Sequence, residues 1–337
     1  MGRKKQHTKR KRIAEFEQYE SVKQWSRHIQ SQKTYEDYMY SLIRFCKWCR
    51  KNPDQLVSER RKNLESEDVA VKRRIEGLVM YYFRNYSKTR SYTTARHVVL
   101  CVKSFFRAND VPLEIRNPKY WRVKTPFIPT VKDIKKILDV SNDLEKLIIL
   151  IMFQSGIRAG TLVKLRYRHV KEDLEAGNIP VCIYLEAYEV KGTQPYCTFL
   201  GKEACEALRN HIKLREKGIK KVKPEIITKE SPLIKRMSKP EPISKIMVYN
   251  IARRAAQRAR LEGISPHALR KAFFYALMKA EVPLKHIECL MGHTPRWNRW
   301  ELHTPTKEQL RKTYREAERY LSISQISDDT NQEASEE

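Results

Sequence analysis

Long apolar runs are absent from this sequence. The longest, Leu147 to Phe153, falls far short of the roughly 18 residues that a membrane-spanning helix needs. The basic start, Met1 to Lys5, is not followed by an apolar stretch, so we expect no secretory signal. The sequence therefore predicts a cytoplasmic protein without a membrane partner, associated with the nucleoid if it binds DNA.

Acidic residues are scarce relative to basic ones. The 337 residues include 68 Lys and Arg against 40 Asp and Glu, which gives a formal net charge of +28. So large a surplus of one sign is self-repelling in a folded protein, and a polyanionic partner is the usual reason for it. We expect a nucleic acid as the partner. The charge alone also fits an RNA-binding or ribosome-associated protein, which is the alternative at this stage.

Cysteine is too sparse and too scattered for a disulfide framework. The seven cysteines are odd in number, and only Cys46 and Cys49 have the spacing of a zinc or redox pair. These two lie in a helical pattern, and no second Cys or His pair with metal-ligand spacing is nearby. We therefore interpret them as core residues and predict neither a metal nor a cofactor.

The distribution of apolar stripes, prolines and charge divides the chain into five segments. Apolar residues recur at helical spacing before Pro112, the prolines 118, 126 and 129 interrupt any periodicity, and the last residues are polar and acidic. The predicted segments are a basic flexible arm over 1–20, a helical bundle with a basic exterior over 21–112, a linker over 113–130, a second domain over 131–321, and an acidic disordered tail over 322–337.

The second domain is predicted to be mostly helical with a small antiparallel β-sheet. A helix from Leu144 to Phe153 is apolar all round, as expected of a buried helix. Two β-prone runs, Val181 to Leu185 and Tyr196 to Leu200, flank a polar stretch with Gly192 and Pro195, which indicates a strand–turn–strand unit. The fold class expected for the whole chain is mainly α, of the α+β type.

Three short motifs and one lysine in the second domain are candidates for chemistry. They are Ser-Gly-Ile-Arg158 after the buried helix, His267-Ala-Leu-Arg270 at a helix start, Leu-Met-Gly-His293 at a helix end, and Lys191 between the two strands. The spacing of His267 and Arg270 puts both on one face of a helix. Each motif alone has an ordinary structural explanation as a cap or a surface residue. Only their combination indicates a site.

This set of cations suits the transition state of phosphodiester cleavage. Attack at phosphorus concentrates negative charge on the non-bridging oxygens, which paired arginines neutralise with forked hydrogen bonds. A Lys or His can protonate the departing 5′ oxygen, and a His can assist deprotonation of the attacking hydroxyl. The nucleophile would be a phenol of the last predicted helix, either Tyr314 or Tyr320.

In order and spacing, these motifs resemble those of the tyrosine recombinase (integrase) family, and most closely its archaeal members. The resemblance covers nearly the whole chain, with residues 21–112 similar to the core-binding domain and 128–321 to the catalytic domain. It implies that Arg158, Lys191, His267, Arg270 and His293 are catalytic. It further implies site-specific recombination of double-stranded DNA without metal, through a covalent 3′-phosphotyrosyl link, by a homotetramer on two DNA sites.

The sequence departs from this family at the nucleophile. The family's tyrosine closely follows the Gly-His box, but residues 294–303 contain no tyrosine, and Leu302 or His303 takes the corresponding position. One explanation is an inserted loop that leaves Tyr314 as the nucleophile, favoured over Tyr320 because the latter lies near the helix end. A second is delivery of Tyr314 to a neighbouring protomer. A third is a catalytically inactive DNA-binding protein of the same fold. Attack by the His303 imidazole ranks last.

Overall fold

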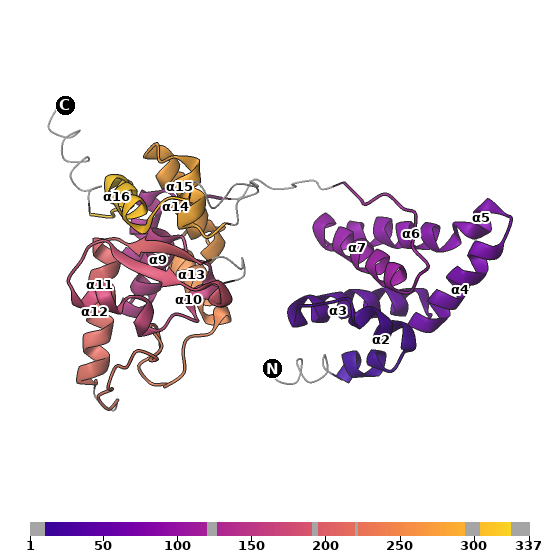
Figure 1. The fold of residues 1–337 in the computed structure, drawn as a ribbon, viewed down its shortest axis with the longest axis horizontal. Helices are drawn as coiled ribbons and strands as arrows, with labels where there is room; N and C mark the ends of the chain where they lie inside the picture. The colour runs from indigo at the N-terminus through magenta and orange to yellow at the C-terminus, as the bar shows by residue number, and fades with distance from the viewer. Residues whose placement is uncertain (1–10, 120–126, 191–194, 220–221, 294–303, 325–337) are drawn as a thin grey trace. The chain divides into compact units, whose positions relative to one another are not determined.

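The computed structural model describes residues 11–119, 127–190, 195–219, 222–293 and 304–324 (Figure 1). The chain forms two units, Met1–Lys124 and Thr125–Glu337, and the boundary lies within residues 113–130, the predicted linker. Both units are mainly helical, and the described residues contain one two-stranded antiparallel sheet, so the predicted fold class is confirmed. In the described part of the chain, no helix is both long and apolar enough to cross a membrane.

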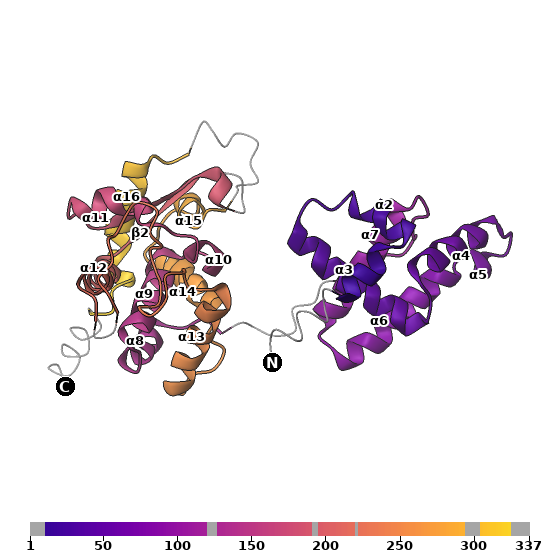
Figure 2. The same cartoon turned by 90° about the horizontal axis from the view of Figure 1, so that it is seen from below.

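The first unit is a helical bundle built around α7. Its helices are α2 (Glu20–Ser26), α3 (Gln32–Cys49), α4 (Pro53–Glu65), α5 (Val69–Lys72), α6 (Arg74–Thr89) and α7 (Tyr92–Ala108). Helix α7 contacts α2, α3 and α6, and Figure 2 shows these helices gathered around it. Cys46 is buried on α3, as predicted for a core cysteine. A hydrophobic core of its own therefore holds this unit together.

The start of the first unit differs from the prediction. Residues 11–17 are helical and Ile13 is buried in the core, so this part of the predicted flexible arm is folded. The apolar stripe is too short to detect from the sequence, because Ile13 and Phe16 are surrounded by charged residues. Helix α3 is capped by Ser31, whose hydroxyl accepts from the backbone N–H of Thr34.

The second unit consists of helices around a short hairpin. Its elements are α8 (Val131–Asp139), α9 (Asp143–Ser155), α10 (Ala159–Leu162), η1 (Tyr167–His169), α11 (Lys171–Glu175), β1 (Val181–Leu185), η2 (Ala187–Glu189), β2 (Tyr196–Leu200), α12 (Lys202–Lys217), α13 (Lys245–Arg258), α14 (Pro266–Lys279), α15 (Leu284–Leu290), α16 (Lys307–Ala317) and η4 (Glu318–Tyr320). The strands have the predicted bounds, and they pair antiparallel with Val181 opposite Leu200.

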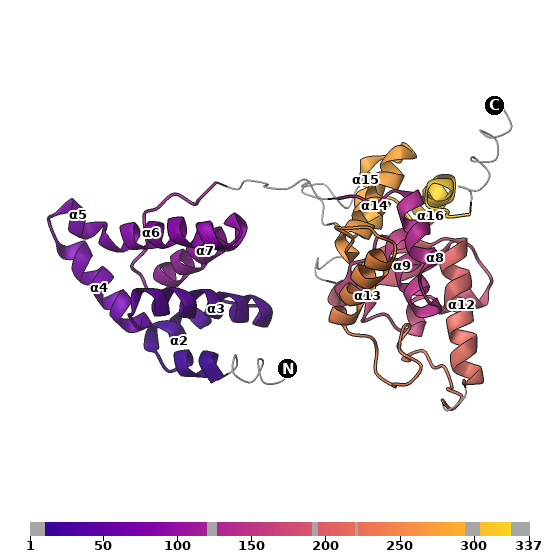
Figure 3. The same cartoon turned by 180° about the vertical axis from the view of Figure 1, so that it is seen from behind.

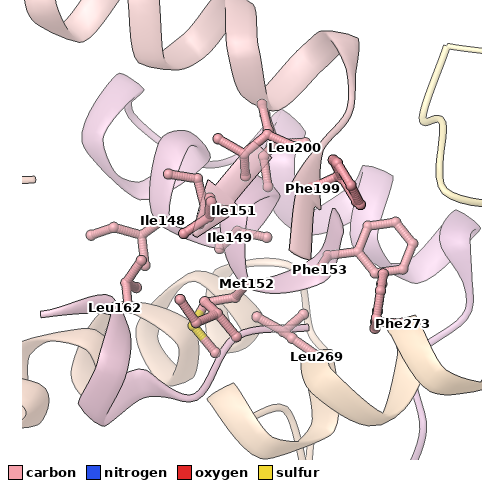
Figure 4. Packing of buried hydrophobic residues seen from close by; sticks show 14 of the residues in the cluster. Ile148, Ile149, Ile151, Met152, Phe153, Leu162, Phe199, Leu200, Leu269 and Phe273 are labelled. Atoms are coloured by element: carbon pink, nitrogen blue, oxygen red, sulfur yellow. The ribbon is translucent and has the colours of Figure 1, made fainter. Parts of the chain in front are cut away.

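Helix α9 is the centre of the second unit. It contacts α8, α12, α13, α14 and β2, and α12 and α13 lie on opposite sides of it in Figure 3. A capping box of Asn142 and Glu145 begins the helix. Its residues from Leu147 to Ser155 are all buried, and Figure 4 shows Met152 and Phe153 packed among side chains from β2 and α14. The prediction of a buried helix is confirmed from Leu147 onward, whereas Leu144 is half-buried. The packing around α9 fixes the position of its C-terminal end.

Candidate functional site

The first motif is a sharp turn that carries Arg158 out of the core. Helix α9 ends at Gly156, whose φ of 60° lies in the left-handed region, and a Cβ there would lie only 2.3 Å from Cδ1 of Phe273. After the glycine, Ile157 is fully buried, whereas the side chain of Arg158 is half-buried at the start of α10. A hydrogen bond also connects the turn to the hairpin: the Thr198 hydroxyl donates to the Ser155 carbonyl at 2.7 Å. The position of Arg158 is therefore determined by the core.

The second motif is the first turn of α14, which joins the other two motifs. Ser265 caps this helix and Pro266 occupies its first turn. Arg270 is buried, and its guanidinium donates to the Gly156 carbonyl through Nη1 and to the Met291 carbonyl, at 2.6 Å, through Nη2. His267 is exposed on the same helix. One arginine thus connects the end of α9 with the segment after α15.

The third motif, at the end of α15, completes the cluster. Gly292 has a φ of 58°, and its carbonyl accepts a hydrogen bond of 3.3 Å from Nη1 of Arg158. The next residue, His293, has its Nε2 3.0 Å from Nη2 of Arg270. The structure therefore brings together Arg158, Arg270 and His293, which lie far apart in the sequence.

The electrostatics of the cluster are those of an anion site. Burial lowers the pKa of Arg270 to about 10, and the charge of Arg158 contributes in the same direction. Burial, Arg270 and Arg158 together lower the pKa of His293 to about 4. The pKa of His267 is also lowered, by burial and then by Lys271, Arg270 and Arg158. At neutral pH both arginines are charged and both imidazoles are neutral, so a bound anion would relieve the repulsion among the cations.

Lys191 lies outside the described residues, but the segment leading to it is well anchored. Glu189 of η2 accepts hydrogen bonds from Nη2 of Arg168, at 2.7 Å, and contacts Nε2 of His169 at 2.9 Å. The Arg168 guanidinium also forms an ion pair with Glu230. These contacts hold the start of the turn between the strands. Glu189 and His169 were not predicted as site residues, because neither belongs to a recognisable sequence motif.

The two candidate tyrosines of the last helix lie in different surroundings. Tyr314 of α16 is fully buried, donates from its hydroxyl to the Gln154 carbonyl at 2.9 Å, and has its ring 5.5 Å from that of Phe199. Burial raises its pKa well above the usual value, and Glu318 adds to the effect. Tyr320 is half-buried, with the Arg319 guanidinium 4.8 Å from its ring centroid. His303 lies outside the described residues. In the conformation described, the Tyr314 phenol is bonded to the core and is not presented to a substrate.

One residue that the sequence analysis missed lies against the cluster. Tyr196, the first residue of β2, has its ring so close to Gly292 that a Cβ there would lie 2.5 Å from its Cε1. Its position directly after the Lys191 turn is the only signal in the sequence. For a metal, the described residues offer no group of three His, Cys, Asp or Glu side chains placed to hold one.

Part of the chain is similar to a known protein family and to several known proteins. Residues 129–296 match the model of the phage integrase family. The chain is 23% identical over 203 residues to the tyrosine recombinase XerA of Pyrococcus horikoshii, a match that covers 58% of this chain and 64% of that protein. It is 25% identical over 231 residues to XerA of Thermococcus kodakarensis, covering 65% of this chain and 73% of the relative.

Two solved structures are similar in fold. The lambda integrase bound to DNA has a TM-score of 0.55 at 15% identity, covering 90% of this chain and 96% of that one. The XerH site-specific recombinase bound to its difH substrate, in a pre-cleavage complex, has a TM-score of 0.53 at 18% identity, covering 85% of this chain and 77% of that one.

Proposed function

Through residues 129–296 the chain belongs to the tyrosine recombinase (integrase) family, and on this premise we propose that it is a site-specific recombinase of double-stranded DNA. The observation that carries the proposal is the convergence of Arg158, Arg270 and His293 at the ends of α9 and α15. These side chains come from separate parts of the chain, and backbone carbonyls hold both guanidiniums. The excess of positive charge over the whole chain supports DNA as the partner.

We assign the roles in strand cleavage from these positions. Arg158, half-buried and able to offer several N–H groups, binds the non-bridging oxygens of the scissile phosphate. Arg270 adds fixed positive charge from the core, which stabilises the charge that develops in the transition state. His293 and the exposed His267 are neutral at neutral pH, so they can accept the proton of the attacking phenol.

In this reaction the phosphate stays a diester, which now joins the DNA strand to the tyrosine. The phenol oxygen bonds to phosphorus, the bond from phosphorus to the 5′ oxygen breaks, and Lys191 gives that oxygen the proton with which it leaves as a hydroxyl. Reversal of these steps by the 5′ hydroxyl of another strand rejoins the DNA. We propose that a homotetramer on two DNA sites carries out the exchange, in association with the nucleoid.

Tyr314 remains the proposed nucleophile, and its contacts in the core have to be broken before it can attack. The phenol has to leave its hydrogen bond with Gln154, and the ring has to leave Phe199, before the oxygen reaches a phosphate on the same or a neighbouring protomer. Movement of α16 away from β2 and α15, which it contacts, would accomplish this.

Trapping of the covalent intermediate tests the proposal. The full-length protein is incubated with sheared genomic DNA from its source and denatured, and the DNA-linked peptide is mapped by mass spectrometry. We expect an adduct on Tyr314, abolished in Tyr314→Phe and in Arg158→Ala and retained in the matched control Tyr320→Phe. An adduct on another residue would keep the enzyme and refute this nucleophile.

The same experiment distinguishes the alternative function. Strong duplex binding without any adduct, also on nicked substrates that prevent religation, would identify a catalytically inactive DNA-binding protein of the same fold. In both cases DNA affinity should fall steeply with salt, because each phosphate contact releases counterions. Tighter binding to single-stranded RNA than to duplex DNA would contradict both functions.

A further inference from the structure

Tyr196 is a buried tyrosine fixed against the phosphate-binding cluster. It opens β2, pairs with Leu185 of β1, and is the first strand residue after the turn that carries Lys191. Its ring fills the space where a side chain at position 292 would be, with Cε1, Cδ1 and Cζ at 2.5, 2.6 and 2.7 Å from an ideal Cβ of that residue. The carbonyl of the same glycine holds Arg158. The tyrosine and the arginine therefore contact the same residue.

Within the described part of the chain, the hydroxyl of Tyr196 lacks the partner that a buried hydroxyl normally has. The side chain is buried, and among the described residues no donor or acceptor forms a hydrogen bond with this oxygen. Buried polar groups of native proteins are rarely left in this state, and those that are need an explanation. Tyr314, the other buried tyrosine of the unit, has its hydroxyl paired with a backbone carbonyl. Packing in the core explains the ring of Tyr196, but a phenylalanine would pack equally well, so packing does not explain the hydroxyl.

Both arginines of the cluster act on this phenol. Burial raises the pKa of Tyr196, while Arg270 and Arg158 lower it, so the two guanidiniums lie close enough to affect the ionisation of the hydroxyl. Since burial prevails, the phenol keeps its proton at neutral pH and can donate a hydrogen bond. A donor beside two cations finds its natural acceptor in an anionic oxygen.

We propose that the Tyr196 hydroxyl is a further catalytic group, which donates a hydrogen bond to an oxygen of the phosphate bound by Arg158 and Arg270. This inference rests on the proposed function. Tyr196 acts as a donor and not as the nucleophile, because its ring is held against Gly292. The hydroxyl gains its partner when the phosphate binds, which accounts for its lack of one among the described residues.

Binding of small phosphate analogues tests this role without knowledge of the DNA site. Orthovanadate and inorganic phosphate are titrated into the full-length protein by calorimetry at constant ionic strength, and thermal unfolding is recorded in parallel. Tyr196→Phe removes one oxygen and keeps the ring. Tyr184→Phe is the matched control, because Tyr184 is an exposed tyrosine on the other strand of the same hairpin. Arg158→Ala identifies binding at the cluster.

We expect Tyr196→Phe to weaken the Arg158-dependent binding by about 10-fold, the usual effect of one hydrogen bond to a charged group. Its Tm should equal or exceed that of the wild type, since among the described residues no hydrogen bond to this hydroxyl is lost. Binding equal to that of Tyr184→Phe would overturn the inference while leaving the proposed function intact. A Tm clearly below that of the control would overturn it too, by revealing an existing partner. Absence of any Arg158-dependent binding in the wild type would instead contradict the proposed function.

Discussion

Replacement of Gly156 by alanine tests whether the turn after α9 is as constrained as the structure indicates. Gly156 has a φ of 60°, which costs a residue with a Cβ about 1–2 kcal/mol. The added Cβ would lie 2.3, 2.8 and 2.9 Å from Cδ1, Cε1 and Cγ of Phe273. This ring is fully buried, and Figure 4 shows it close to Phe153, so it has little room to move. Overpacking of this kind costs about 1–3 kcal/mol.

Together these effects predict that Gly156→Ala destabilises the second unit by about 2–5 kcal/mol. The matched control is Gly160→Ala, four positions along the chain in α10, where a Cβ has nothing within 4 Å and φ is not positive. Alanine is the better helix former, so this control should be unchanged or more stable by up to about 1 kcal/mol.

Urea titration read by hydrogen exchange of peptides from α9 measures both variants, because these peptides report on the second unit alone. Since the Gly156 carbonyl accepts from Arg270, the variant should also bind phosphate more weakly. A loss below about 1 kcal/mol, or one equal to that of Gly160→Ala, would refute the argument that steric exclusion fixes this turn.

Three further predictions concern ionisable side chains. Glu76→Leu leaves the buried Arg60 without its ion-pair partner and should destabilise the first unit by about 3–5 kcal/mol in urea, most of which the double variant with Arg60→Met should restore. Burial and then Arg215 lower the pKa of His211 to about 4 from 6.5. Between these pH values the unfolded state binds a proton that the native state does not, so stability is lost as pH falls from 6.5 to 4. His211→Gln should remove this loss of up to about 3 kcal/mol, and an unchanged pH dependence of unfolding would contradict the prediction. Glu203 accepts hydrogen bonds from the backbone N–H groups of Ile323 and Ser324, at 2.7 and 3.1 Å. Glu203→Gln should therefore speed the exchange of these two amides, and unaltered protection would show that the carboxylate does not hold the residues after η4 in place.

The elements of the fold that local patterning controls were predictable. The bounds of both strands and the buried character of α9 follow from short-range apolar patterns, which reflect burial on one face or on all sides. Helix α4 was not singled out, because few of its residues are apolar and one of its buried side chains is Arg60. A charged residue is buried only when it finds partners, here the distant Glu76 and the Pro112 carbonyl, and local periodicity carries no information on them.

The sequence by itself determined which residues are available for chemistry and in what order, and this order sufficed to identify the family. Only the tertiary structure decided which of them meet. It placed Arg270 between two backbone carbonyls from distant segments, paired the Tyr314 hydroxyl with Gln154, and left that of Tyr196 beside the arginines without a partner among the described residues. The physical reason is that hydrogen bonding and burial of a side chain depend on contacts between segments over 100 residues apart, such as Gly156 with Arg270, which short-range patterns do not encode.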